Sequence, residues 1–153
     1  MKIELLTLND FPKYRDEMAG QLNDLVRRDF PSDRISEDYG SMKCEDIRRH
    51  LEDGSAVIFL ALEEEGLLGW LWCHEIGRFE EKRLHIADIY IKEGSRGKGI
   101  GTVLMKEAED YARNKNYSGI DLLVTNSNRE AVSFYEKEGF SAERSFMTKR
   151  FEC

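Results

Sequence analysis

The chain has 153 residues, of which 41% are hydrophobic and 35% charged, and it carries a net charge of −7. These values are typical of a soluble, globular protein with one domain over residues 1–153. The acidic balance disfavours nucleic-acid binding, which requires a basic surface. The longest apolar run, Ala56–Leu62, is too short to cross a bilayer. The sequence therefore predicts neither a nucleic-acid nor a membrane partner.

The cysteines and the N-terminus indicate the compartment. The residues that follow Met1 include an acidic side chain and no cleavage site, which argues against a signal peptide. Cys44, Cys73 and Cys153 are odd in number, and their spacing fits neither a disulfide framework nor a zinc site. A reducing, cytoplasmic location without a bound metal is the expectation.

Hydrophobic periodicity divides the chain into helices and strands. In the N-terminal part we expect a strand over residues 2–8, a helix capped by Asn9 or Asp10 that stops before Pro31, and a helix over residues 41–53 that Gly54 ends. In the rest we expect strands over residues 55–63, 67–76 and 83–91, a helix from Ile100, a strand over 119–124, a helix that begins with a capping box at Ser127–Glu130 and ends at Gly139, and a last strand over 144–151. The strand–helix–strand run predicts one parallel pair with a right-handed crossover in an otherwise antiparallel sheet.

A glycine-rich turn, Arg96–Gly101, separates the strand that ends at Ile91 from the next helix. Glycines permit positive φ and allow a bound group to approach the backbone. The first N–H groups of a helix have no internal partners, and the helix dipole favours an anion there. The turn therefore predicts a pyrophosphate site, with a purely structural turn as the alternative. The residues match neither a P-loop nor a Rossmann fingerprint, because Gly94–Thr102 lacks the first pattern and no acid ends the following strand.

Two motifs in register resemble those of the GNAT superfamily of N-acetyltransferases. The first, Arg/Gln-x-x-Gly-x-Gly/Ala, is matched by Arg96, Gly99 and Gly101. The second is matched by Asn128, Ala131, Phe134-Tyr135 and Gly139-Phe140. The resemblance covers Ser55 to Cys153 well. It implies an α/β (α+β) fold, in which a mixed, mostly antiparallel sheet with a central splayed parallel strand pair is flanked by about four helices.

The resemblance also implies acetyl-CoA as the donor and assigns its contacts. Strand residues would present backbone groups to the pantetheine arm, in the way that a ligand adds to a strand edge. The glycine-rich turn would hold the pyrophosphate, Asn128 would hydrogen-bond the cofactor, and Tyr135 would face its sulfur. The expected cofactor-binding residues are Ile89, Tyr90, Ile91, Arg96, Gly97, Lys98, Gly99, Ile100, Gly101, Asn128, Ser133 and Tyr135.

Acetyl transfer to an amine requires a base, an oxyanion donor and an acid. An alkyl amine has a pKa of about 10.4, so it must lose a proton before it attacks. A backbone N–H near Ile89 or Tyr90 suits the oxyanion. A thiol pKa of about 8.5 and a tyrosine pKa of about 10 are close enough for Tyr135 to protonate the departing thiolate. A core aromatic is the alternative role for this tyrosine.

The base is left open between His85 and Glu75. Several members of the family place a glutamate at the position of Ala87, and alanine cannot replace it. His85 lies two residues earlier on the same strand face, where other members place their base, and a pKa of about 6.5 suits proton uptake. A hydrogen-bonded surface histidine is the alternative. Asp88 is a further candidate that a regular strand would point to the opposite face from His85.

These residues predict an N-acetyltransferase that moves the acetyl group to a primary amine by direct attack. A small-molecule acceptor is favoured over a protein, and a homodimer would be in keeping with the family. Loop acids would attract a cationic amine, although a solvated loop is the simpler explanation of Asp29, Asp33, Glu37 and Asp38. The alternatives are a non-catalytic acyl-CoA-binding regulatory module, which the absence of an acid at Ala87 favours, and an enzyme that acetylates a protein or peptide amine.

Overall fold

The computed structural model describes residues 1–152. They form two compact units, one over Met1–Leu123 and one that begins at Val124. The first unit contains, in chain order, β1 (Lys2–Leu5), α1 (Phe11–Asp29), α2 (Tyr39–Glu52), β2 (Ala56–Glu63), β3 (Gly66–Arg78), β4 (Glu81–Ile91), α3 (Ile100–Asn114) and β5 (Ile120–Leu122). Each matches a predicted element with small shifts at its ends, as expected for boundaries that periodicity defines only loosely.

One sheet organises the first unit, with the strands in the order β1-β2-β3-β4-β5. The pairs β1–β2, β2–β3 and β3–β4 are antiparallel, and β4–β5 is parallel. The predicted mixed sheet is therefore confirmed. The parallel pair lies at the end of this order, because the described residues after β5 add no strand to it.

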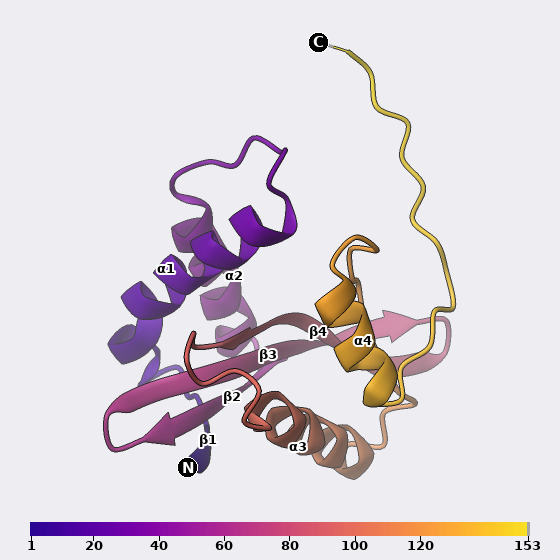
Figure 1. Ribbon diagram of the computed structural model, residues 1–153. Coiled ribbons are helices and arrows are strands. Elements are labelled where there is room, and N and C mark those ends of the chain that lie inside the picture. The colour runs from indigo at the N-terminus through magenta and orange to yellow at the C-terminus, as the bar shows by residue number, and fades with distance from the viewer. Residues whose placement is uncertain (153) are drawn as a thin grey trace. The chain divides into compact units, whose positions relative to one another are not determined.

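Helices cover both faces of the sheet, with α1 and α2 on one face and α3 on the other (Figure 1). The alternation of side chains along β3 explains the two cores. Trp70 and Trp72 point toward α1 and α2, where they pack with Met18 and Ile47. Both tryptophans are buried, which agrees with a role in the core.

Close packing joins α1 to α2. A Cβ atom on Gly40 would lie 1.9 Å from the backbone oxygen of Ala19, so only glycine allows this approach. The Gly40 amide also donates to Asn23 Oδ1 at 2.8 Å. The buried Cys44 lies at the same contact, and its thiol donates to the Arg15 backbone oxygen at 3.5 Å.

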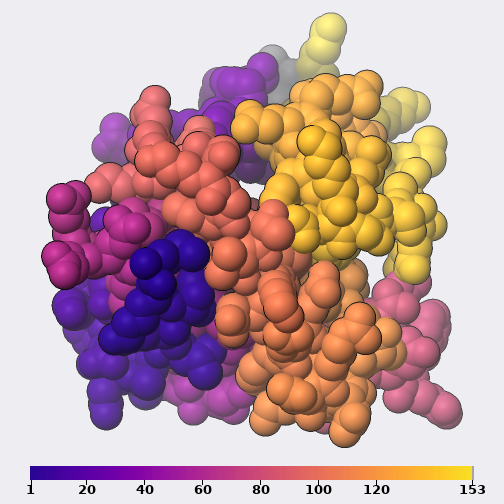
Figure 2. Space-filling view, turned by 60° about the horizontal axis from the view of Figure 1, so that its bottom comes forward, coloured from indigo at the N-terminus to yellow at the C-terminus, as the bar shows by residue number. Residues whose placement is uncertain are grey.

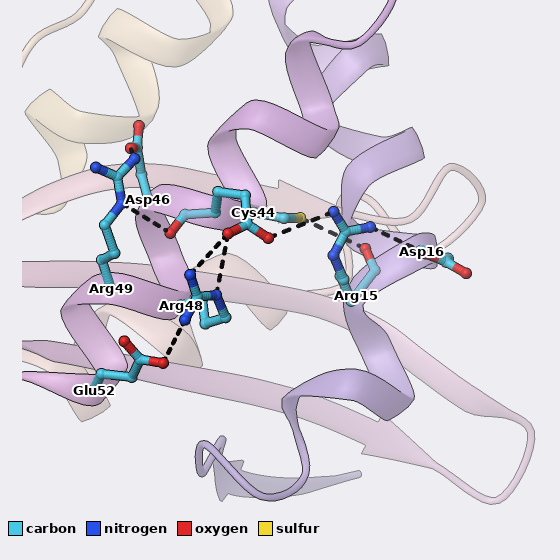
Figure 3. A network of polar contacts seen from close by, with 8 residues as sticks. Arg15, Asp16, Cys44, Asp46, Arg48, Arg49 and Glu52 are labelled. Atoms are coloured by element: carbon cyan, nitrogen blue, oxygen red, sulfur yellow. Dashed lines mark hydrogen bonds and ion pairs between the residues drawn. The ribbon is translucent and has the colours of Figure 1, made fainter.

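A surface network of ion pairs runs along α2 and reaches α1 (Figure 3). Glu45 contacts Arg48 at 3.0 Å and Arg15 at 3.9 Å, and Arg49 contacts Asp46 at 2.7 Å. These side chains are largely exposed, so each pair contributes little to stability. The close backbone contact at Gly40 therefore fixes the helix pair more firmly than the charges do.

On the other face of the sheet, α3 lies beside β1 (Figure 2). A cavity of about 220 Å³ opens between them, lined by Leu5, Phe59 and Tyr111 together with acidic side chains of α3. The tight core here is formed by Leu104, Met105 and other small or apolar residues of α3, which are fully buried. This packing holds the start of α3 at the end of β4.

The second unit contains α4 (Arg129–Lys137). Its N-cap is Asn128, whose Oδ1 accepts from the Ala131 amide at 3.2 Å, so the predicted capping residue Ser127 is wrong by one position. The C-terminus has the predicted glycine cap. Gly139 adopts φ +94°, and the Phe140 amide donates to the Tyr135 backbone oxygen at 3.0 Å. The Gly139 amide donates to the Glu136 backbone oxygen at 3.1 Å, and these two bonds with the Tyr135–Phe140 ring contact form a Schellman motif.

The predicted last strand over residues 144–151 is wrong. Residues 141–152 have no regular secondary structure, and all of them are exposed. The apolar side chains Phe146, Met147 and Phe151 are each at least 80% exposed. Alternating apolar residues form a strand only when a neighbouring strand accepts their backbone hydrogen bonds.

Two further features concern the described residues alone. Cys44 and Cys73 are free and buried, and Cys153 lies outside the described residues. Within residues 1–152, no helix is both long and apolar enough to span a membrane.

Candidate active site

The parallel strands β4 and β5 pair over only part of the length of β4. The ladder between β4 and β5 joins Leu84 to Ile120 and ends where Ile86 faces Leu122. β4 continues to Ile91, and its residues Ile89, Tyr90 and Ile91 pair with β3 on the other side. The β5 side of this segment therefore presents backbone groups that an extended ligand can hydrogen-bond.

The glycine-rich turn follows directly after this open edge. Gly94, Gly97 and Gly99 all adopt φ between +75° and +85°, a region that other residues rarely occupy. The Arg96 guanidinium donates through Nε to the Ile91 backbone oxygen at 3.1 Å, which ties the turn to the end of β4. The glycines thus have the conformational role that the sequence predicts, and Arg96 has a structural role at the end of β4.

The N-terminus of α3 meets the turn at Gly99, which has no side chain to cap the helix. The backbone bond from the Val103 amide to the Gly99 oxygen, at 3.1 Å, is the first of the helix. The amides of Ile100 and Gly101 precede this bond and face the turn. Orphan amides and the helix dipole together make this end suited to a phosphate.

A β-bulge in β4 changes which side chains share a face. Trp72 of β3 pairs with Asp88, but the next residue, Cys73, pairs with Ile86, so Ala87 is the extra residue. The Trp72 indole donates through Nε1 to Asp88 Oδ2 at 2.9 Å. The expectation that Asp88 points away from His85 is therefore wrong, because it assumed a regular strand.

His85 forms a pair with Asp121 across the parallel strands. The two residues are opposite each other in the register, and His85 Nδ1 lies 2.6 Å from Asp121 Oδ1. A carboxylate only accepts, so Nδ1 carries the proton and Nε2 of the neutral ring can take up another. The side chains are 23% and 28% exposed, so the ring is reachable from outside. The sequence reasoning missed Asp121, which the parallel register of the two strands could have placed beside His85.

Two more histidines continue from His85 toward α2. The His74 ring lies 5.2 Å from His85 and 4.6 Å from His50, and the His50 ring lies 5.7 Å from the Trp72 ring. Burial lowers the pKa of His74, and the neighbouring imidazoles act in the same direction. Residues 1–152 contain no group of three or more His, Cys, Asp or Glu that could hold a metal ion. These rings instead form an aromatic wall beside His85.

Asp88 lies beside Trp72 on the face of the sheet that His85 shares. Burial raises its pKa to about 6, while the Trp72 hydrogen bond and the positive charge of Lys43 act in the opposite direction. Lys43 lies on α2, and burial, followed by the Asp88 charge, raises the pKa of Tyr39 on that helix. The carboxylate therefore faces the α1–α2 layer.

Glu75 lies on the other face of the sheet. It accepts a hydrogen bond from the Tyr117 hydroxyl at 2.9 Å, and Lys82 Nζ lies 3.1 Å from its second oxygen. The Lys82 and Tyr117 contacts lower the pKa of Glu75. The α3 side therefore holds Glu75, while His85 and Asp88 share the α1–α2 side.

The remaining expected residues belong to the second unit. Asn128 caps α4, Ser133 is exposed on it, and Tyr135 is half-buried against Phe140.

An open strand edge that leads into a glycine-rich helix start is the arrangement expected of a coenzyme A-dependent acyltransferase. A model of the acetyltransferase (GNAT) family matches residues 20–140. The chain belongs to this family, whose members use acetyl-CoA as donor.

Relatives and solved structures agree with this assignment. Streptothricin acetyltransferase of Streptomyces lavendulae is 35% identical over 116 residues, which cover 76% of this chain and 60% of that protein. The chain thus spans about three fifths of this relative. A putative acetyl transferase from Pyrococcus furiosus superposes with a TM-score of 0.75 at 27% identity and covers 98% of this chain and 100% of that one. A predicted acetyltransferase from Clostridium acetobutylicum, solved with acetyl-CoA, shares the fold at a TM-score of 0.77 and 15% identity, covering 97% of this chain and 95% of that one.

Proposed function

We propose that the protein transfers an acetyl group from acetyl-CoA to the primary amine of a small molecule. The observation that carries the proposal is the open β4 edge beside the His85–Asp121 pair, followed by the glycine-rich turn. The name of the streptothricin relative supports a small-molecule acceptor.

In the proposed reaction the amine nitrogen attacks the thioester carbonyl carbon. His85 Nε2 takes the proton of the ammonium, directly or through one water, and Asp121 stabilises the imidazolium that results. His85 is preferred to Glu75 because Glu75 pairs with Lys82 and Tyr117 on the opposite face. A backbone N–H of Ile89 or Tyr90 stabilises the oxyanion.

The tetrahedral intermediate then breaks its C–S bond. The electron pair goes to sulfur, and Tyr135 gives its phenolic proton to the thiolate. The donor is held by backbone groups of Ile89–Ile91, by the turn Arg96–Gly101, and by Asn128 and Ser133 of the second unit. The products are the acetylated amine and coenzyme A.

An acceptor screen tests this proposal. Acetyl-CoA is offered with polyamines, aminoglycosides, amino acids and peptides, and thiol release is measured. Turnover with a small-molecule amine is the expected result. Turnover with peptides alone would contradict the small-molecule acceptor, and release with none of them would favour the non-catalytic acyl-CoA-binding module.

Calorimetry with acetyl-CoA tests donor binding independently of the choice of acceptor. Binding without turnover would leave the donor site intact and reject catalysis with these amines. No binding at millimolar acetyl-CoA would reject the donor site itself.

A further inference from the structure

We propose that Asp88 binds the ammonium group of the acceptor and makes the enzyme selective for cationic amines. This inference rests on the proposed acetyl transfer and adds to it the residue that recognises the acceptor. It gives Asp88 a role separate from that of His85, which moves the proton.

The bulge at Ala87 brings Asp88 to the side of the sheet that His85 occupies. In a regular strand, residues 85 and 88 would point to opposite faces. The extra residue restores them to one side, where Asp88 pairs with Trp72 and the ring of His74 packs between Trp72 and His85. A carboxylate and an imidazole three positions apart thus face the same space beside the open strand edge.

Trp72 fixes the carboxylate and leaves it able to accept another donor. The indole Nε1 bonds to Oδ2 at 2.9 Å. Among residues 1–152, this indole is the one donor to Asp88 that the structure gives. A primary ammonium has three N–H groups and can donate to Oδ1.

Asp88 is also a half-buried acid that forms no ion pair within residues 1–152. Buried charges in proteins are ordinarily paired, because an isolated carboxylate is costly to remove from water. The charges that act on it are Lys43 of α2 and His85 of β4, both of which favour its ionised form, and Asp29 of α1, which disfavours it. A cationic ligand would supply the missing partner.

Steady-state kinetics with Asp88→Asn test the proposal on an alkyl amine that the acceptor screen has shown to be turned over. We expect KM for this amine to rise at least about tenfold, since a hydrogen bond to a charged group is lost with its charge. KM for acetyl-CoA should stay unchanged, because the donor contacts are elsewhere on β4. An unchanged KM for the amine, or an equal rise in both KM values, would overturn the inference.

Matched variants and ligands separate charge from structure. Asp16→Asn removes the same charge from a side chain that is 98% exposed, and we expect no change in KM. A non-reacting quaternary ammonium analogue of the amine should bind more weakly to Asp88→Asn in calorimetry, and its uncharged tert-butyl analogue should bind both proteins equally. Equal weakening of both ligands would indicate a change of shape and reject the proposal.

Trp72→Phe provides a second measurement if Asp88→Asn folds poorly in thermal unfolding. It keeps an aromatic ring and removes the indole N–H, so KM for the amine should rise less than in Asp88→Asn. No rise would count against the proposal. If the proposed function is wrong, the wild-type protein releases no thiol from acetyl-CoA. If only the inference about Asp88 is wrong, the wild-type protein still releases thiol.

Discussion

Tyr135 can be tested without disturbing its surroundings. Its ring packs at 5.7 Å against Phe140, which the Schellman motif holds in place, so Tyr135→Phe removes only the hydroxyl. If Tyr135 protonates the thiolate, kcat should fall by about a hundredfold or more. The affinity for acetyl-CoA, measured by calorimetry, should change little.

Tyr117→Phe is the matched control for this substitution. Its hydroxyl bonds to Glu75 on the α3 side, and its pKa is raised to about 12, first by burial and then by that bond. Its loss should lower stability by about 1 kcal/mol and leave kcat unchanged. Equal losses of turnover and of acetyl-CoA binding in Tyr135→Phe would instead indicate a structural role for Tyr135.

Asp88 gives a prediction for stability against pH. Its pKa is raised from 3.8 to about 6 in the folded protein, so its protonated form favours folding. This contribution is fully present below pH 3.8 and is lost as pH rises through about 6. A shift of about two pKa units corresponds to about 3 kcal/mol as an upper value.

Asp88→Asn should therefore be more stable than the wild type at pH 8, by about 1–3 kcal/mol in urea unfolding. The difference should shrink toward pH 4, where both side chains are uncharged. A variant that is equally stable or less stable at pH 8 would show that the ionised carboxylate does not destabilise the folded protein. The expected gain in stability, together with the kinetics, would show that Asp88 serves binding at the expense of stability.

The identities of these residues were easier to predict than their directions. His85 was found because its residue type suits proton transfer, and the parallel register then explains its bond to Asp121. The direction of Asp88 depends on one extra residue in β4, which the alternation of side chains does not reveal. Periodicity assumes a regular strand, so it fails at the point where a bulge changes the site.

The contact between α1 and α2 belongs to the scale of elements, and two glycines provide a matched pair. Gly40→Ala would place a Cβ against the Ala19 backbone oxygen and should lower the free energy of unfolding by about 1–3 kcal/mol. Gly20→Ala lies in α1 with nothing within 4 Å of the new Cβ, and should raise it by about 0.5–1 kcal/mol.

Urea unfolding of both variants measures the two effects under the same conditions. A lower free energy of unfolding in both variants would mean that glycine is needed for reasons other than the close approach. A higher free energy of unfolding in both would mean that α1 and α2 can move apart at little cost. The helix α2 carries Lys43 and Tyr39, which interact electrostatically with Asp88. Because Gly40→Ala would displace α2, it should also raise KM for the amine.

Elements with a buried face were predictable, whereas caps and the last strand were not. α1 and α3 each present an apolar stripe to the sheet, and that stripe appears in the sequence as steps of three and four. The N-cap of α4 falls on Asn128 and not Ser127, because both residue types can cap a helix. Apolar and polar side chains alternate over residues 144–151 as in a strand. Pairing also requires a neighbouring strand, which this pattern does not identify.

At the scale of the whole molecule, the net charge of −7 should draw cationic acceptors from a distance. Raising the ionic strength from about 0.01 M to about 0.1 M shortens the Debye length from about 30 Å to about 10 Å. We therefore expect kcat/KM for a dicationic amine to fall several-fold. For an arylamine, which is uncharged at pH 7, it should stay constant.

A matched salt series with sodium chloride and potassium chloride checks that the effect is one of screening. The same fall with the uncharged amine would mean that salt acts on the protein itself. A constant kcat/KM for the dication would mean that local contacts, such as the one proposed for Asp88, account for charge selection without help from the overall field.

The extra residue in β4 marks a place where this strand is open to a very small genetic change. Loss of the Ala87 codon would let β3 and β4 pair without interruption, and Asp88 would stay opposite Trp72 on the face that holds α1 and α2. The histidine pair with Asp121 and the glycine-rich turn would each keep their sequence. The gene can therefore lose this codon in frame while the carboxylate proposed for the acceptor keeps its side of the sheet.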